Sequence, residues 1–289
     1  MHSASEDASA GRQRGDSKEF PLLDDEYRYL TSIVYDRSGI VLGANKVNMV
    51  YSRLVRRLRE LRLASFRDYC TLLESDKGVV EIGFLINAIT TNLTSFFREN
   101  HHFEHLRNTV LGDIARGKAK PRIRIWSAGC SSGEEPYSIA MTLADTFPDF
   151  DRCDARILAT DLDTTMVATG KAGLYPAEAV AELPGATRAK FFRRPVGEKC
   201  EMIEPVKRLI AFKHLNLLGA WPMKGPFDAI FCRNVMIYFD GPTKAALVAR
   251  YAGLLKPEGW LYIGHSESLL DNSAGFRLAG RTIYRKSPA

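Results

Sequence analysis

The sequence predicts an α/β protein in which a largely parallel sheet follows a helical N-terminal domain. Three observations support this prediction. Apolar residues recur at helical spacing between residues 24 and 87, strand and helix patterns alternate after Pro121, and a glycine-containing loop joins the first of these strands to a helix. A strand, a tight loop and a helix in this order are typical of α/β units that bind nucleosides.

The N-terminal part is expected to contain a tail, a helical domain and a connecting segment. Residues 1–20 are polar, and we expect them to form a disordered tail. Residues 21–95 are expected to form the helical domain, and residues 96–120 a linker and a helix. The core-facing stripe of the domain is predicted to consist of Val47, Val50, Leu54, Leu58 and Leu61. Arg53, Arg56 and Arg57 lie away from this stripe, so we expect them at the surface.

The remaining residues, 121–289, are expected to form the sheet domain. The predicted parallel strands span residues 122–126, 156–159, 209–213, 229–232 and 260–264. A final pair, 277–279 and 282–285, is expected to close the sheet in antiparallel orientation. The alternation breaks down between Lys171 and Lys207, where residues 199–206 predict an extra strand outside the main sheet.

The loop after the first strand predicts a ligand site. Gly129 and Gly133 permit a sharp reversal and a close approach of the ligand, and Pro136 suits the first turn of a helix. Asp161 ends the second strand, where its carboxylate can accept hydrogen bonds from both hydroxyls of a ribose.

The charge of this loop argues against a phosphate ligand. The dinucleotide pattern G-x-G-x-x-G is absent, and Glu134 and Glu135 stand where a pyrophosphate would need bare N–H groups. These carboxylates favour a cationic nucleoside, and S-adenosylmethionine (SAM) fits because it carries a sulfonium and an ammonium but no phosphate. The alternative is that the two acids only stabilise a helix N-terminus.

Three further segments supply polar residues near the expected site. Asn216 and Leu217 follow the third strand, where an amide can pair with an adenine edge or simply form a turn. Arg233, Asn234 and Tyr238 follow the fourth strand, although Tyr238 would also suit a core. Before the linker, residues 90–99 gather Asn92, Thr94 and Arg98, which capping by Thr94 or Ser95 does not explain.

The composition excludes several classes of protein. With 289 residues, of which 45% are hydrophobic and 26% charged, the chain can bury a full core. Its five cysteines show no C-x-x-C spacing, so we expect neither disulfides nor a metal site. Because no apolar run is long enough to span a bilayer and no secretory pattern is present, we expect a cytoplasmic protein. The net charge of +6 suggests nucleic acid, anionic lipid or acidic protein as a partner.

Five segments carry a resemblance to a known family. They are residues 89–98, 126–140, 159–163, 225–240 and 264–267. In these segments the chain resembles the CheR-type chemotaxis receptor methyltransferases, which methylate glutamates on transmembrane receptors. The resemblance implies a class I SAM-dependent methyltransferase fold with a Rossmann-like sheet, a helical N-terminal domain and a small inserted β-subdomain near residues 190–213. It also implies SAM binding by Asn92, Thr94, Arg98, Glu135, Asp161, Asn216, Leu217, Arg233 and Asn234.

The resemblance also gives expectations about the reaction and the partners. A glutamate carboxylate is already deprotonated at neutral pH, so no general base is required. Arg98 and Tyr238 are expected to hold this carboxylate in line with the methyl group. Arg53, Arg56 and Arg57 are expected to dock on the cytoplasmic helical region of the receptor, and a receptor C-terminal pentapeptide is a possible further ligand of the β-subdomain. We expect a monomer that is recruited to membrane receptor arrays and binds no nucleic acid.

Three rival interpretations remain at this point. Residues 129–133 match the G-x-S-x-G elbow of α/β hydrolases around Ser131, and Asp228 and His265 follow in triad order. However, the elbow follows the first strand of the sheet, with only helices before it. A nucleic-acid methyltransferase would carry an Asn-Pro-Pro-Tyr type motif after the fourth strand, where this chain has Arg-Asn-Val-Met. A non-catalytic, receptor-binding relative is the third alternative.

Overall fold

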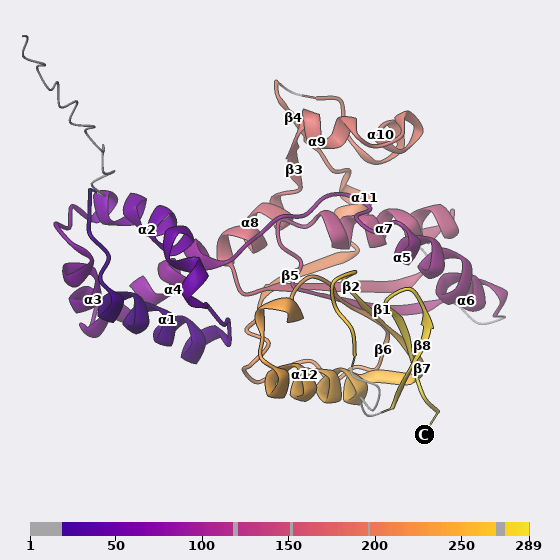
Figure 1. Cartoon of the computed structure of the whole chain (residues 1–289). Coiled ribbons are helices and arrows are strands. Elements are labelled where there is room, and N and C mark those ends of the chain that lie inside the picture. The colour runs from indigo at the N-terminus through magenta and orange to yellow at the C-terminus, as the bar shows by residue number, and fades with distance from the viewer. Residues whose placement is uncertain (1–18, 118–120, 151–152, 196, 270–274, 289) are drawn as a thin grey trace, which may run out of the picture.

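The computed structural model describes residues 19–117, 121–150, 153–195, 197–269 and 275–288. A helical domain lies on one side and an α/β domain on the other, and a short linker joins them (Figure 1). The tail predicted for residues 1–20 lies, except for its last two residues, outside the described residues. Among the described helices, none combines the length and the apolar character that crossing a membrane requires.

The helical domain has the core that the sequence predicts. Its elements are α1 (Asp24–Ser38), the 3-10 turn η1 (Ala44–Lys46), α2 (Val47–Leu61), α3 (Phe66–Glu74) and α4 (Gly78–Ile89). On α2, the fully buried positions of the stripe are Val50, Leu54 and Leu58, with Val55 beside them. Val47 and Leu61, at the two ends of the helix, are only partly buried. The 3.6-residue period therefore located the core face correctly.

One interrupted helix follows the linker and leads into the first strand of the sheet. It consists of α5 (His101–His105), the π-helical turn η2 (Leu106–Leu111) and α6 (Gly112–Arg116). Phe103, Leu106 and Leu111 are buried on the same face of the sheet as α7 (Glu134–Thr146). This packing holds the linker residues before His101 close to the sheet.

The main sheet confirms the predicted α/β class. Its strand order is β5-β2-β1-β6-β7-β9-β8, and all pairs are parallel except those that β9 makes with β7 and β8. The strands are β1 (Arg122–Ala128), β2 (Asp154–Asp161), β5 (Ile210–His214), β6 (Phe227–Cys232), β7 (Leu255–Ile263), β8 (Phe276–Gly280) and β9 (Ile283–Lys286). Each overlaps a predicted strand.

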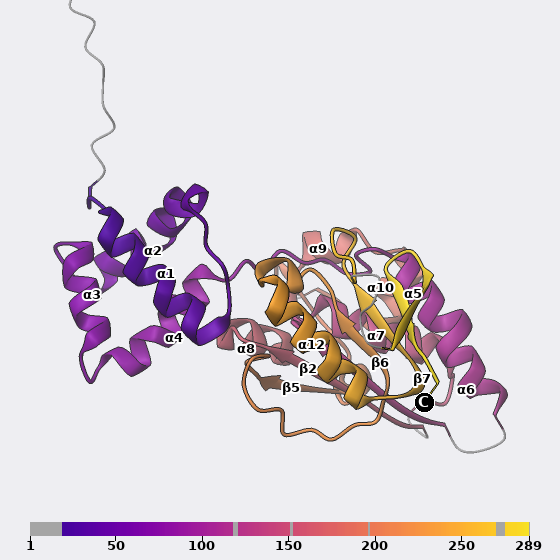
Figure 2. The same ribbon diagram turned by 60° about the horizontal axis from the view of Figure 1, so that its bottom comes forward.

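Helices cover both faces of this sheet. In Figure 1, α12 (Gly241–Leu254) lies below the sheet, and α5, α6 and α7 lie above it. The turned view of Figure 2 shows α12 in front of the strands. Alternate residues of β1 serve the two faces, because Trp126 packs with Tyr251 of α12 whereas Ile125 joins the cluster that contains Tyr137 of α7. The helical domain shares the core on the α12 face.

The inserted β-subdomain lies earlier in the chain than expected. It consists of β3 (Leu174–Pro176), α9 (Ala177–Ala181), α10 (Gly185–Phe191) and β4 (Lys199–Glu201), and β3 and β4 pair in antiparallel orientation. The expected range of 190–213 is wrong, because residues 210–214 pair with β2 in the main sheet. The extra strand expected at 199–206 is only β4, and α11 (Glu204–Lys207) follows it.

Candidate cofactor and acceptor site

A pocket lies beyond the carboxyl ends of β1, β2 and β6. All nine residues predicted to bind the cofactor line it, and so does Tyr238. Ser38 and Ile40 of the helical domain also line it, so both domains contribute. About 930 Å³ inside the pocket is free of protein atoms, part of it open to solvent. Its position outside the carboxyl ends of parallel strands is where α/β sheets bind their ligands.

The glycine loop after β1 has the conformation that its sequence predicts. Gly129 has φ +94° and Gly133 has φ +101°, both in the left-handed region that favours glycine. A Cβ atom on Gly129 would lie 2.3 Å from Cγ2 of Val235, which belongs to the loop after β6. The absence of side chains thus lets two loops of the pocket approach each other closely.

Asp161 is oriented by backbone N–H groups. Its Oδ2 accepts a hydrogen bond from the Ser131 N–H at 2.7 Å, and its Oδ1 accepts one from the Asp163 N–H at 2.9 Å. Burial raises the pKa of this carboxyl above its usual range. Each oxygen keeps a free lone pair, so the group can still accept hydrogen bonds from two neighbouring hydroxyls.

The two acids after Gly133 have different environments. Glu135 lines the pocket, where its Oε1 accepts a hydrogen bond from Ser127 Oγ at 2.7 Å. Glu134 does not line it and instead accepts a hydrogen bond from Ser132 Oγ at 2.6 Å. Burial raises the pKa of both carboxyls. The expectation that both acids face the ligand is therefore wrong for Glu134, because the first turn of α7 points the two side chains in different directions.

Arg233 is held between carboxylates rather than presented freely to the pocket. Its guanidinium donates to Glu135 Oε2 at 3.2 Å and lies 3.6 Å from Glu99 Oε2. It also donates to the backbone carbonyl of Arg98. The side chain is only 2% exposed. Arg233 thus neutralises two buried acids and fixes the end of the linker.

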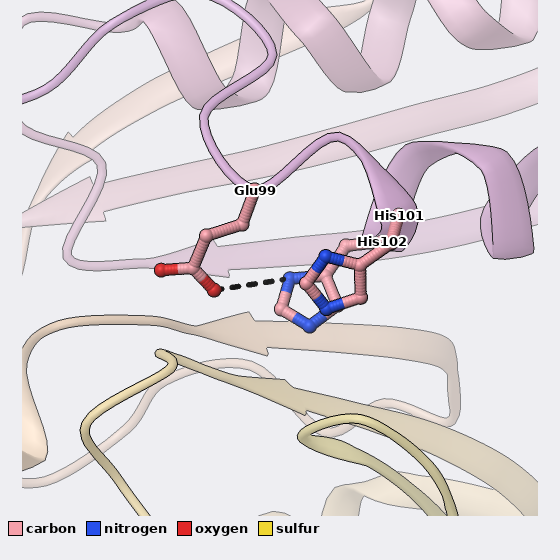
Figure 3. Close-up of side chains that lie close together, drawn as sticks. All are labelled: Glu99, His101 and His102. Carbon is pink, nitrogen blue, oxygen red and sulfur yellow. Dashed lines mark ion pairs between the residues drawn. The ribbon is translucent and has the colours of Figure 1, made fainter.

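Glu99, His101 and His102 form a cluster with the ligand types of a metal site (Figure 3). Glu99 Oε2 and His102 Nδ1 are buried, lie 3.7 Å apart and have no hydrogen-bond partner. Burial lowers the pKa of His102 to about 3, so its ring is neutral. A metal cation between these atoms would also face the guanidinium of Arg233 beside the same Glu99 oxygen. This repulsion argues for charge balance as the role of Glu99.

The linker residues of the site are tied to the α/β domain. The Asn92 side-chain amide donates to Asp163 Oδ2 at 2.8 Å, and the Asn92 carbonyl accepts from Ser131 Oγ at 2.9 Å. Arg98 Nη1 donates a hydrogen bond to the carbonyl of Leu93 at 2.9 Å. The other N–H groups of its guanidinium remain available to a ligand. Thr94 lines the pocket beside them.

Asn216 has a structural role that the sequence did not reveal. Its side-chain amide donates to the carbonyl of Arg37 at 2.6 Å, and its side-chain oxygen accepts from the Leu218 N–H at 2.9 Å. The first bond ties the helical domain to the loop after β5. One N–H and one lone pair remain for the adenine edge that we expected this amide to contact. Leu217 is buried beside it and supplies an apolar surface.

Glu267 is a supporting residue that sequence reasoning missed. It is buried and accepts hydrogen bonds from the N–H groups of Asn234, at 2.9 Å, and Ile237, at 3.1 Å. A Cβ atom on Gly264 would lie 2.8 Å from the backbone nitrogen of Asn234. Together they shape the loop that ends in the turn η4 (Met236–Tyr238). Its sequence signal is the family resemblance of segment 264–267, which indicates no role for this glutamate.

The hydrolase interpretation fails on geometry. Ser131 Oγ donates to the carbonyl of Asn92, so it is not paired with a histidine. His265 is bonded to Glu99 through Nδ1, at 2.9 Å, and Asp228 pairs with Lys256 at 2.6 Å. The three residues of the expected triad therefore have separate partners.

The arginines of α2 are more deeply engaged than expected. Arg53 donates to the carbonyls of Ile89 and Thr90 at the end of α4, at 2.5 and 2.8 Å. Arg57 forms two hydrogen bonds to Glu81, at 2.9 and 2.7 Å. Only Arg56 has a largely exposed side chain, at 86%. Arg53 and Arg57 are therefore only partly exposed, because both stabilise the packing of α2 on α4.

Comparison with known proteins gives the same assignment as the pocket. Residues 25–90 match the family model described as "CheR methyltransferase, all-alpha domain". Residues 92–285 match the model described as "CheR methyltransferase, SAM binding domain". The chain belongs to the CheR methyltransferase family. It is therefore a SAM-dependent methyltransferase of the chemotaxis type, and the nucleic-acid and non-catalytic alternatives are not favoured.

Full-length relatives support this membership. The chain is 45% identical to a "Probable chemotaxis protein methyltransferase" of Rhizobium etli, over 88% of this chain and 96% of the relative. It is 43% identical to the "Chemotaxis protein methyltransferase" of Escherichia coli, over 92% of each chain. A solved geranyl diphosphate C-methyltransferase from Streptomyces coelicolor is 16% identical, with a TM-score of 0.33 over 57% of this chain and 44% of that one. This last likeness is too low to carry an argument.

Proposed function

We propose that the protein transfers the methyl group of SAM to glutamate side chains of chemotaxis receptors and forms methyl esters. The observation that carries this proposal is the convergence of Asn92, Arg98, Asp161 and Tyr238, from three separate segments, on one pocket. The relatives named as chemotaxis protein methyltransferases support the choice of receptors as substrates.

The donor set of the pocket fits a cationic nucleoside without phosphate. Asp161 and Glu135 are carboxylates whose burial disfavours their ionised form, and a cationic ligand would offset that cost. Asp161 is placed to bind the ribose, Asn92, Thr94 and Glu135 the amino-acid part, and Asn216 and Leu217 the adenine. Arg233 and Asn234 support Glu135 and the loop after β6. When bound, SAM supplies an electrophilic methyl group.

The glutamate carboxylate that accepts the methyl group must be positioned, but it needs no general base. A glutamate carboxylate is ionised at neutral pH, so no proton has to be removed. The free N–H groups of Arg98 and the hydroxyl of Tyr238 can donate to its oxygens and set the direction of approach. Closure of the receptor over the pocket would then remove water from the nucleophile.

The reaction is tested by tritiated methyl transfer from SAM to receptor-bearing membranes, followed by mild alkali. Methyl esters release volatile methanol, whereas N-methyl and S-methyl products do not. Receptors in which the methylated glutamates are replaced by alanine provide the control. Label that is stable to alkali, or that appears equally in the control receptors, would contradict the proposal.

The partner surfaces follow from the same proposal. Arg56 and its α2 neighbours are proposed to face the helical cytoplasmic region of the receptor, with Arg56 as the most accessible cation. The small β3–β4 sheet projects away from the main sheet (Figure 1) and is the candidate site for a receptor C-terminal pentapeptide. We further propose a monomeric cytoplasmic enzyme that is recruited to receptor arrays through these contacts.

A further inference from the structure

Four hydrogen bonds beside Asp161 form a closed ring. Ser131 Oγ donates to the Asn92 carbonyl at 2.9 Å, and the Ser131 N–H donates to Asp161 Oδ2 at 2.7 Å. The Asp163 N–H donates to Asp161 Oδ1 at 2.9 Å, and Asn92 Nδ2 donates to Asp163 Oδ2 at 2.8 Å. The ring, defined by these four residues, connects the linker after α4, the glycine loop after β1 and the carboxyl end of β2.

Asp163 has the largest number of partners in the ring. It is only 2% exposed. Its Oδ1 accepts from the N–H groups of Thr165 and Met166, at 2.8 and 3.3 Å, and so caps the helix α8 (Thr164–Ala172). Its Oδ2 accepts from Asn92 and from Thr90 Oγ1, the latter at 2.9 Å. Since each oxygen already has two donors, Asp163 acts on the linker and not on a ligand.

Ser131 has a backbone conformation that is unusual for serine. Its φ of +48° lies in the left-handed region, where a side chain carries a steric cost that glycine avoids. The hydroxyl compensates for this cost because it reaches the carbonyl of Asn92, a contact that glycine could not make. The strained serine thus joins two segments of the pocket.

We propose that Ser131 and Asp163 are positioning residues for cofactor binding. Through the ring they orient the Asp161 carboxylate and hold the linker that carries Asn92, Thr94 and Arg98 beside it. A linker held in place before binding loses less conformational entropy when the ligand arrives, so affinity is higher. This inference rests on the proposed placement of the cofactor in this pocket.

Serine variants separate a positioning role from a structural one. Ser131→Gly removes the hydroxyl and also the backbone strain, so we expect Tm to stay constant or rise. Calorimetric titration with S-adenosylhomocysteine is expected to show a Kd about tenfold higher, as is Ser131→Ala. Ser132→Ala is the matched control, because its hydroxyl bonds Glu134 outside the pocket lining, and it should leave Kd within about twofold.

Aspartate variants provide an independent matched pair. Asp240, like Asp163, caps a helix, because it accepts a hydrogen bond from the Thr243 N–H at 2.9 Å. It also accepts a hydrogen bond from a hydroxyl of the helical domain, Tyr35 Oη, at 2.8 Å. Asp240 lies outside the ring. We expect both Asp163→Asn and Asp240→Asn to lower Tm, the former more because Asp163 is more deeply buried, but only Asp163→Asn to raise Kd, by about tenfold. The KM for SAM should change more than kcat.

The ring itself predicts non-additivity. Either Ser131→Ala or Asp163→Asn opens it, so the double variant should show an effect close to the larger single effect. A double effect equal to the product of the single effects, or Kd values within twofold of wild type in both single variants, would overturn the inference. Asp161→Ala distinguishes a failure of the proposed cofactor placement from a failure of the proposed positioning role. If it leaves Kd unchanged, the cofactor placement itself fails. If it weakens binding while the ring variants do not, only the positioning role fails.

Discussion

The arginines of the pocket and Arg53, Arg56 and Arg57 of α2 share a pattern: in each region one arginine keeps accessible donors and the others are committed to internal contacts. In the pocket, Arg233 is buried between Glu99 and Glu135, and Arg98 has N–H groups to spare. On α2, Arg53 and Arg57 hold α4, and Arg56 is exposed. The difference between the regions is desolvation, which makes electrostatic interactions stronger in the pocket than on the surface. Substitutions in the pocket should therefore have the larger functional effects.

The largest effect is expected for Arg98→Ala. Loss of the donors that position the acceptor should lower kcat by about 10²-fold, the magnitude expected when a reacting group is misplaced by about 1 Å. Tyr238→Phe removes one donor only and should lower kcat by about tenfold. Both are measured as tritiated methyl transfer at saturating SAM. Arg98→Lys keeps the charge without the planar fork and should recover only part of the rate. Unchanged kcat in both Arg98→Ala and Tyr238→Phe would remove the proposed roles.

A structural effect is expected for Arg57→Ala. The change would leave Glu81, whose side chain is 7% exposed, without its bidentate partner. We expect the free energy of unfolding to fall by about 3 kcal/mol, because the buried carboxylate would keep a hydrogen bond from Tyr69 but no cationic partner. Chemical denaturation measures this loss. Arg56→Ala is the matched control on the same helix and should change stability by less than about 0.5 kcal/mol. Equal losses in the two variants would contradict the assignment of Arg57 to the fold.

The pH dependence of cofactor binding should also distinguish the buried acids of the pocket from exposed acids. Burial raises the pKa of Glu135 and of Asp161, so both carboxyls keep their protons to higher pH than exposed acids do. The α-ammonium group, which S-adenosylhomocysteine shares with SAM, favours the ionised forms. Affinity for S-adenosylhomocysteine should therefore fall as the pH is lowered from neutral through these raised values. Calorimetry across this range checks the slope, which should be shallower in Glu135→Gln. An equal slope in wild type and variant would rule out Glu135 as the titrating group.

The smallest effect is expected for Arg56→Glu. An exposed charge changes association more than chemistry, so KM for the receptor should rise a few-fold at low salt and by less at high salt. Calorimetric affinity for S-adenosylhomocysteine should not change, since Arg56 is absent from the pocket lining. A receptor KM that is insensitive to both the charge reversal and salt would remove α2 from the docking surface.

The sequence was most informative where a feature depends on neighbouring residues in the chain, such as an apolar run or a position at the end of a strand. Strands such as β6 follow from their apolar runs, and Gly129, Asp161 and Tyr238 follow from their places after strands. It was least informative where a polar side chain forms a hydrogen bond or ion pair with a residue far away in the chain. Nothing local in the sequence indicates that Asn216 bonds Arg37 or that Arg57 bonds Glu81. The inserted sheet was misplaced for the same reason, because three-residue strands such as β3 carry almost no periodic signal.

The contribution of Ser38 and Ile40 to the pocket limits how this enzyme can be divided. A fragment that starts at residue 92, where the SAM-binding family model begins, would lose both residues together with Thr90 and Thr91. It would also uncover apolar side chains such as Met236 and Phe239, which share a core with the helical domain. Expression of that fragment alone should therefore yield an aggregating, ligand-free product.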